Sequence, residues 1–274
     1  METKETKKKR DGKKSRGLSA GIVIGVCFIV ALSVFMFIFG DPSNFINNDP
    51  SNHPLPGNYL GTIYKGGPVV CIVLTLLLTT LVLSVERAFA LSKARGKGNL
   101  IQLVHDVKKN LEKGDLNAAE ALCAKQQGSV AAVISAGLKK YQEMETTTEK
   151  LSKEQKLLAI QKDIEEATAL ELPTMQQNLP VIATISTLGT LFGLLGTVLG
   201  MIRSFAAMST AGAPDSVALA TGISEALINT AFGIATGAIA IISYSFFTGK
   251  IDNMTYAIDE MGFSIVQTYA SKHE

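Results

Sequence analysis

The stretch that decides the fold is Leu188-Gly-Thr-Leu-Phe-Gly-Leu-Leu-Gly-Thr-Val-Leu-Gly-Met201, an apolar run with a glycine at nearly every helical turn. Because a helix turns by about 100° per residue, these glycines fall on one side of it and form a ridge. The ridge consists of Gly189, Gly193, Gly196 and Gly200. Hydroxyl side chains, Thr197 among them, follow the stripe beside the ridge. The pattern indicates a membrane helix that packs closely against a neighbour and lines a polar path, since a simple anchor needs only Leu, Ile and Val.

A second apolar stretch, 217–247, repeats this design and carries a single charge, Glu225. Its polar half also holds Asn229 and Thr230. Two glycines, Gly233 and Gly237, lie on the same half and are expected to serve helix packing. Leu, Ile and Ala dominate the opposite half, which we expect to face lipid.

Gaps in the distribution of charged residues show how many times the chain crosses a membrane. Each gap reaches the roughly 20 residues that span the hydrocarbon core. We predict an all-α polytopic membrane protein with four transmembrane helices, at 18–39, 67–89, 180–207 and 217–248. The last two exceed the minimum length, which suggests helices that project beyond the bilayer into a cytoplasmic helical bundle.

The Lys and Arg residues predict the orientation, because cytoplasmic segments are enriched in them. The basic tail 1–17 carries eight, the region 90–179 is dense in Lys, and the loop 208–216 has none. We therefore predict cytoplasmic N- and C-termini, periplasmic loops at 40–66 and 208–216, and a cytoplasmic helix at 249–274. A cleaved signal peptide is the alternative for the first span, but its apolar run exceeds the usual length and lacks a small-x-small site.

Local signals in the region 90–179 predict several helices. One runs over 99–111 and stops near Gly114, one follows Asp115, and one follows Gly128. A long helix from Lys150 is expected to lead into the membrane, with Pro173 and Pro180 as potential kinks. Residues 249–268 have apolar side chains at helical spacing and are expected to continue the fourth span, or else to form an interfacial helix.

Several functions are disfavoured. The three cysteines and three histidines are far apart in sequence, so no metal site, disulfide framework or cofactor site is predicted. The glycine-rich run lacks the Lys of a phosphate-binding loop. No nucleophile–base pair suggests an enzyme, so no catalytic residues are assigned, and the N-terminal lysines are better explained by topology than by nucleic-acid binding.

The two membrane stretches together resemble a known family. The glycine run just described and Gly222-Ile-Ser-Glu-Ala-Leu-Ile-Asn-Thr-Ala-Phe-Gly233 are similar to the signature of the MotA/TolQ/ExbB proton channel family, and most similar to its ExbB branch. Glu86-Arg87 and Gly114-Asp115-Leu116 are weaker supporting matches. The resemblance covers about 67–250, so the first span lies outside the three-span family core.

This resemblance implies a pentameric ring around helices of a single-span partner, ExbD or TolR, whose intramembrane Asp takes up and releases the ion. It also implies that rotation of the partner delivers work through TonB to outer-membrane transporters. Thr197, Thr230 and Glu225 correspond to pore-lining positions of the family, with Asn229 beside them. Asn229 and Arg203 differ from the residues more common in ExbB.

Alternatives remain at this stage. The two threonines could instead bond their own helix carbonyls, Glu225 could pair with Arg203, and the glycine ridge is better explained by packing than by conduction. For function, the alternatives are a TolQ-like subunit for envelope maintenance, a MotA-like stator, and a non-conducting four-span scaffold.

Overall fold

A computed structural model describes residues 19–148, 150–210 and 216–273 of the chain. The predicted basic tail 1–17 and most of the predicted loop 208–216 lie outside the described residues. Within them the secondary structure is helical, apart from turns and one isolated bridge between Phe45 and Pro54. The all-α fold class predicted from sequence is confirmed for this part of the chain.

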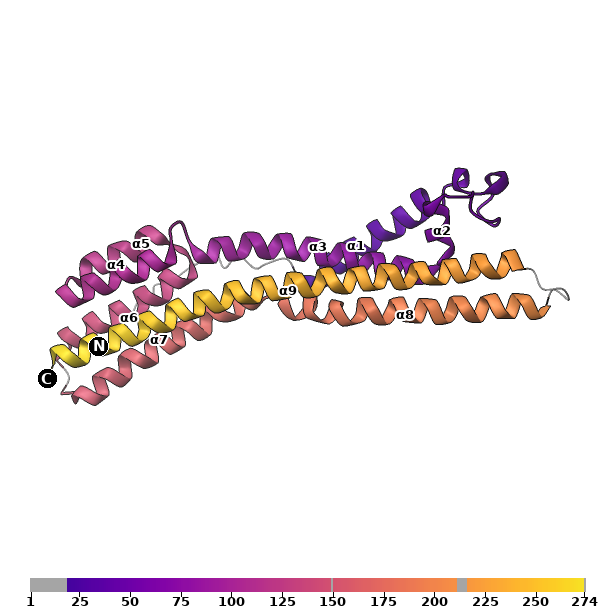
Figure 1. Ribbon diagram of the computed structural model, residues 1–274. Helices are drawn as coiled ribbons and strands as arrows, with labels where there is room; N and C mark the ends of the chain where they lie inside the picture. The colour runs from indigo at the N-terminus through magenta and orange to yellow at the C-terminus, as the bar shows by residue number, and fades with distance from the viewer. Residues whose placement is uncertain (1–18, 149, 211–215, 274) are drawn as a thin grey trace, which may run out of the picture.

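Two helices form a hairpin, and the longer of them runs the length of the molecule (Figure 1). α8 (Leu179–Thr210) and α9 (Ser216–Lys272) lie side by side over their apolar halves (Figure 1). The 57 residues of α9 make it about 85 Å long at 1.5 Å per residue, far more than a bilayer core requires. Residues 249–268, which were expected to continue the fourth span, lie within α9 and are helical throughout.

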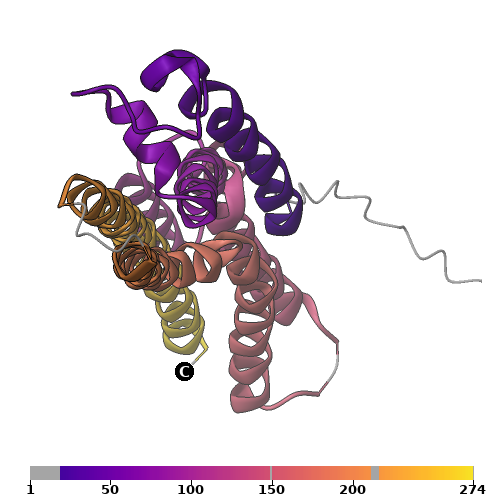
Figure 2. The same ribbon diagram turned by 90° about the vertical axis from the view of Figure 1, so that its right-hand side faces the viewer.

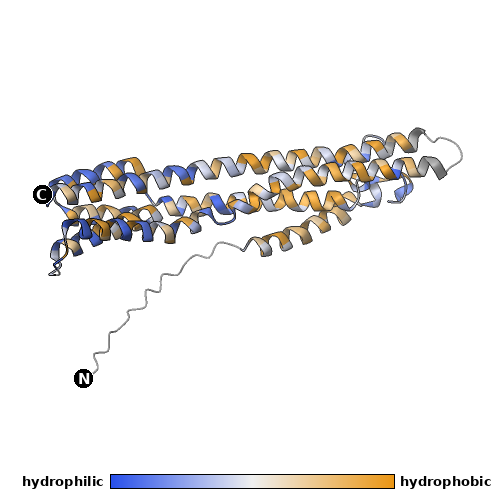
Figure 3. Cartoon of the chain, turned by 90° about the horizontal axis from the view of Figure 1, so that it is seen from below, coloured by the Kyte–Doolittle hydropathy of each residue, from blue (hydrophilic) through white to orange (hydrophobic). Residues whose placement is uncertain are grey.

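A bundle of shorter helices surrounds the C-terminal part of α9. These helices are α4 (Leu100–Lys113), α5 (Leu116–Gln126), α6 (Gly128–Thr146) and α7 (Lys153–Gln176). Their ends follow the sequence signals: Gly114 adopts the left-handed conformation after α4, and the Asp115 side chain accepts a hydrogen bond from the Ala118 amide at the start of α5. Hydrophilic residues concentrate at this end of the molecule and apolar residues at the other (Figure 3).

The first half of the chain packs against one side of the hairpin. α1 (Ala20–Val34) continues as a π-helix (Phe35–Phe39) and lies against α3 (Pro68–Arg95) through a small core that includes Ala31, Phe35 and Val70. Residues 40–67, which we call the connecting segment, join the two. This segment holds two short 3-10 helices (Pro42–Asn44, Ile46–Asn48) and α2 (Tyr59–Lys65), and Figure 2 shows it beside the hairpin end.

The helical conformation is interrupted between α7 and α8. α8 follows α7 after two residues. Gln177 has an extended ψ and Asn178 has a positive φ of 65°, so one helix ends and the next begins here. The sequence placed potential kinks at Pro173 and Pro180. Pro173 lies inside α7 without ending it, whereas Pro180 is the second residue of α8, where its missing N–H costs nothing.

Among the described residues, four helical stretches are long and apolar enough to cross a membrane. They lie within Ala20–Phe39, Pro68–Lys113, Lys153–Ala206 and Gly222–Lys272. This finding supports a multi-pass membrane protein with four spans. The division into membrane, cytoplasmic and periplasmic segments stays a prediction.

Candidate functional site

Glycines bring α8 and α9 into backbone contact. A Cβ added to Gly193 would lie 2.9 Å from the Gly233 Cα, and one added to Gly196 would lie 2.5 Å from the Asn229 Cβ. At Gly200 the added carbon would lie 2.6 Å from the Ala226 Cβ. Gly189 and Gly237 also face the opposite helix, the first near Thr236 and the second near Ser186 and Thr190. No larger residue fits at most of these positions unless the helices separate.

Two threonine hydroxyls meet within this close contact. The Thr197 and Thr230 hydroxyls are hydrogen-bonded to each other across the interface. Both also reach the Gly193 carbonyl oxygen at 3.2 Å, and Thr197 reaches the Ala226 carbonyl oxygen at 3.2 Å. The Thr197 contact to Gly193 is the bond to its own helix that the simpler interpretation expects, but the other contacts cross between helices. The pair is half-buried and forms a polar link in an apolar interface.

Asn229 precedes Thr230 and is almost fully buried, with 1% of its surface exposed. Its Nδ2 donates to the Gly66 carbonyl oxygen at 3.1 Å, which ties α9 to the connecting segment. Its Oδ1 is buried without a hydrogen-bond partner among the described residues. A buried acceptor of this kind costs free energy, about 1–3 kcal/mol, unless a water or a ligand meets it.

Beside Asn229 lies a small, partly open pocket of about 60 Å³. We call it the hairpin pocket; its lining residues are Lys65, Gly66, Gly200, Arg203, Ser204, Gly222, Glu225, Ala226 and Asn229. Glu225 is half-buried here and Arg203 is exposed. The ion pairs formed by the described residues do not include Glu225, so the pairing with Arg203 considered from sequence is not made within 4 Å in one protomer.

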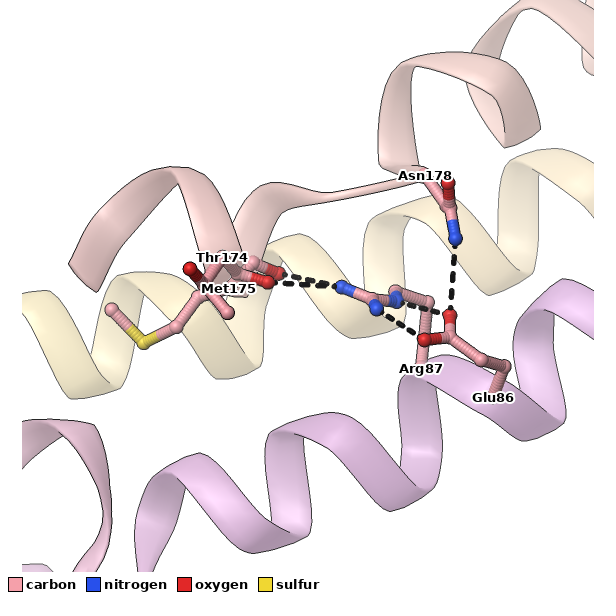
Figure 4. A network of polar contacts seen from close by, with 5 residues as sticks. All are labelled: Glu86, Arg87, Thr174, Met175 and Asn178. Atoms are coloured by element: carbon pink, nitrogen blue, oxygen red, sulfur yellow. Dashed lines mark hydrogen bonds and ion pairs between the residues drawn. The ribbon is translucent and has the colours of Figure 1, made fainter. Parts of the chain in front are cut away.

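A second polar cluster lies at the α7–α8 break (Figure 4). We call it the break cluster: Glu86, Arg87, Thr174, Met175 and Asn178. Arg87 is 1% exposed, and its Nε and Nη2 donate to the two carboxylate oxygens of Glu86 at 2.7 and 2.5 Å. The Asn178 Nδ2 donates to the same carboxylate at 3.3 Å.

The break explains why Arg87 is buried there. In an unbroken helix the carbonyls of Thr174 and Met175 would accept from the amides four residues on, but the helix stops at Gln176. The Arg87 Nη1 donates to these two carbonyl oxygens instead, at 3.2 and 3.3 Å. Arg87 therefore caps α7 from another helix, and Glu86 neutralises its charge.

Sequence reasoning named most of the hairpin residues but missed three contributors. Lys65 and Gly66 belong to a segment treated only as a loop, and the role of Asn178 requires the break. The Glu86-Arg87 pair was noticed as a motif without a role. The sequence did contain an indication of this role. Two adjacent opposite charges at the end of an apolar helix are costly to bury unless other groups form hydrogen bonds with them.

Other reactive groups are structural. Cys27, Cys71 and Cys123 are free and buried. Burial raises the pKa of the Cys123 thiol to about 12, with a smaller contribution from Glu120. No group of three or more His, Cys, Asp or Glu residues suited to a metal ion occurs in the ranges that the structure describes.

Fold and site together define a multi-pass helical membrane protein whose two glycine-packed helices carry a hydroxyl pair and a carboxylate. The family model for the MotA/TolQ/ExbB proton channel family matches residues 125–260, which include the whole α8–α9 contact. The chain belongs to this family, whose members are channel and motor subunits rather than enzymes.

Curated relatives agree with this assignment. A biopolymer transport protein ExbB homolog of Methanothermobacter thermautotrophicus is 26% identical over 200 residues, which cover 72% of this chain and 66% of that protein. ExbB-like protein 3 of Synechocystis is 33% identical over 113 residues, 40% of this chain and 54% of that protein. The Tol-Pal system protein TolQ of Pseudomonas aeruginosa is 34% identical over 84 residues, 31% and 36% of the two chains. The matches thus span two thirds or less of these relatives.

Proposed function

We propose that this chain is the proton-channel subunit of an ExbB–ExbD-type motor of the inner membrane. It would use the proton motive force to energise TonB-dependent transport across the outer membrane. The observation that carries the proposal is the hydroxyl pair of Thr197 and Thr230 at the glycine contact of α8 and α9. Hydroxyls in this position can hold water or a carboxyl group within an apolar layer.

The chain needs a partner to complete a proton path. Its membrane hairpin holds one carboxylate, Glu225, and the hydroxyl pair lies more than one helical turn further along α9. Threonine hydroxyls do not ionise at physiological pH, so a second chain must supply a titrating group beside them. A single-span ExbD- or TolR-like protein with an intramembrane Asp has the required chemistry, and it would sit in the centre of a pentamer of this chain.

The proposed orientation follows from charge. With the bundle of α4 to α7 in the cytoplasm, the Lys-rich surface faces inward and both termini lie inside, as the positive-inside rule requires. The hairpin pocket and the connecting segment then lie at the periplasmic side. The break cluster lies near the cytoplasmic surface of the membrane.

Reconstitution tests the proposal. The chain is purified with a candidate single-span ExbD- or TolR-like partner and placed in liposomes. A pH gradient is then applied while a pH-sensitive dye reports proton entry. Proton flux that requires both chains, and that disappears when the partner's membrane Asp is changed to Asn, is the expected result. Intact complexes without flux under a pH gradient and a membrane potential would favour the non-conducting scaffold.

The match to TolQ favours a second candidate, a motor that maintains the cell envelope. Deletion of the gene distinguishes the two roles. A TonB-type role predicts poor growth when iron is supplied only as a siderophore or haem complex, with a normal envelope. A Tol-type role predicts detergent sensitivity and leakage of periplasmic proteins, with normal iron uptake.

A further inference from the structure

The connecting segment forms one wall of the hairpin pocket. Lys65 and Gly66 line the pocket, and the Gly66 carbonyl binds Asn229. The next residue, Gly67, lies against the Arg203 guanidinium, since a Cβ added to Gly67 would be 3.4 Å from the Arg203 Nη1. Residues 40–67 precede the region 125–260 that the family model matches. A part of the chain outside that region therefore completes a pocket built on α8 and α9.

The pocket combines oxygen atoms with two cations. Its oxygens come from the Glu225 carboxylate, the Ser204 hydroxyl and the Asn229 Oδ1, which has no hydrogen-bond partner in the part of the chain that the structure describes. Lys65 and Arg203 line the same space. The formal charges of Lys65, Arg203 and Glu225 sum to +1.

The Lys65 side chain makes two contacts within the connecting segment. Its Nζ donates to the Ser51 carbonyl oxygen at 3.0 Å and lies 5.7 Å from the Phe45 ring centroid. Both partners belong to the connecting segment, so these contacts orient the ammonium group on that segment. The segment in turn is bound to α9 through Gly66.

We propose that Lys65 is a specificity-determining residue that keeps metal cations out of the hairpin pocket. This inference rests on the proposed function, because it assigns the pocket to the periplasmic mouth of the ion path. Sodium needs several oxygen ligands around it, and the pocket offers them. The positive charges of Lys65 and Arg203 make the lining of the pocket net positive, which disfavours the entry of a further cation. A proton needs no such shell, because it passes between water and a carboxylate by exchange of a hydrogen bond.

The charge reversal Lys65→Glu tests this inference. It sets a second carboxylate beside Glu225 and changes the net charge of the pocket from +1 to −1, which creates an oxygen-rich cation site. Proton flux of the reconstituted complex is measured with sodium or with choline at constant ionic strength. We expect sodium to leave the wild-type flux unchanged and to lower the flux of Lys65→Glu by about tenfold.

Two further variants control for charge and shape. Tyr59→Glu adds a carboxylate to the same short helix at a side chain that is 78% exposed and does not line the pocket. It should remain insensitive to sodium. Lys65→Arg keeps the cation and should also remain insensitive. If Lys65→Glu and Tyr59→Glu respond to sodium alike, the inference is wrong.

Sodium binding can be measured without flux, which separates this inference from the proposed function. A bound ion stabilises the folded protein, so sodium should raise the denaturation temperature of purified Lys65→Glu but not of the wild type or Tyr59→Glu. If that shift occurs while the wild-type complex conducts no protons, the proposed function fails and the assignment of Lys65 stands. If the wild type conducts but Lys65→Glu gains no stability and no sodium inhibition, the assignment of Lys65 fails alone.

Discussion

The break cluster and the hairpin pocket use similar residues in opposite ways. In the break cluster a carboxylate and a guanidinium are joined by two hydrogen bonds, and each finds further partners in the break region. In the hairpin pocket a carboxylate and two cations surround open space without an ion pair among the described residues, beside a buried acceptor that lacks a partner. The charges of the break cluster are paired with each other, whereas those of the hairpin pocket face open space.

This difference indicates where stability and function reside. A satisfied buried cluster loses much when one member is removed, because the remaining charge is left without a partner. An open, half-buried cluster loses little stability, but its unpartnered oxygens remain available to water and ions. We therefore expect substitutions in the break cluster to damage the fold, and substitutions in the hairpin pocket to damage transport.

Arg87→Met should have the largest effect on the fold. It leaves the largely buried Glu86 carboxylate, which is 13% exposed, with the Asn178 hydrogen bond but without its cation. It also removes the Arg87 donor from the Thr174 and Met175 carbonyls, for a total loss of about 3–5 kcal/mol. Denaturation temperature in mild detergent and recovery of the complex measure this loss. Arg95→Met, on the exposed last turn of the same helix, is the control. If both variants are recovered equally with the same denaturation temperature, the break cluster does not stabilise the fold.

Gly196→Leu should come next, because it acts on the helix contact itself. Its first added carbon would already lie 2.5 Å from the Asn229 Cβ, so α8 and α9 must separate, at a cost of about 1–3 kcal/mol or more. Native mass spectrometry should show less assembled complex. Gly249→Leu adds the same side chain to α9 where no atom lies within 4 Å of an added Cβ, and it should assemble normally. Equal assembly of the two variants would argue against a packing role for the ridge.

Glu225→Gln should separate stability from transport. Its carboxylate has no ion pair within 4 Å among the described residues, so we expect the free energy of unfolding to change by less than about 1 kcal/mol. Proton flux should nevertheless fall by about tenfold, because the mouth loses its titrating group. A large loss of stability with normal flux in the surviving complex would reverse the assignment of the two clusters.

Labelling of Cys123 should show the smallest effect, because this thiol lies inside the helical bundle and reports whether the bundle opens. Burial raises its pKa to about 12, so at pH 8 only about 10⁻⁴ of the thiol is ionised and reaction with maleimide should be very slow. A cysteine introduced at Lys65, in a protein with Cys27→Ala and Cys71→Ala, should react quickly at pH 8. Rapid labelling of Cys123 at that pH would show that the bundle opens.

The sequence predicted the helices well because their signals are local. Asn99, Gly114 and Asp115 act on the backbone within a few residues of themselves, and glycine spacing on one helix identifies its packing face without knowledge of the partner. The residues that this face contacts, Gly233 and Asn229 among them, depend on how the two helices pair and were not predicted.

The missed features depend on contacts between distant segments. Arg87 meets Thr174 across 87 positions, and Asn229 meets Gly66 across 163, which no periodicity can reveal. The position of the break could not be predicted either. Pro173 and Pro180 marked the region, but the helix is interrupted at Gln177, between them. Lys65 was missed because a single Lys in a predicted loop normally carries no information about a pocket.

The central claim is that the hydroxyl pair of α8 and α9 lines the proton path, and the double variant Thr197→Val/Thr230→Val tests it most directly. Valine keeps the shape of threonine without the hydroxyl, and Thr184→Val, at an exposed site on α8, is the matched control. In liposomes that contain the chain with its single-span partner, proton flux of the double variant should fall by about tenfold or more while the complex stays intact. Flux equal to that of Thr184→Val at equal amounts of intact complex would contradict the claim.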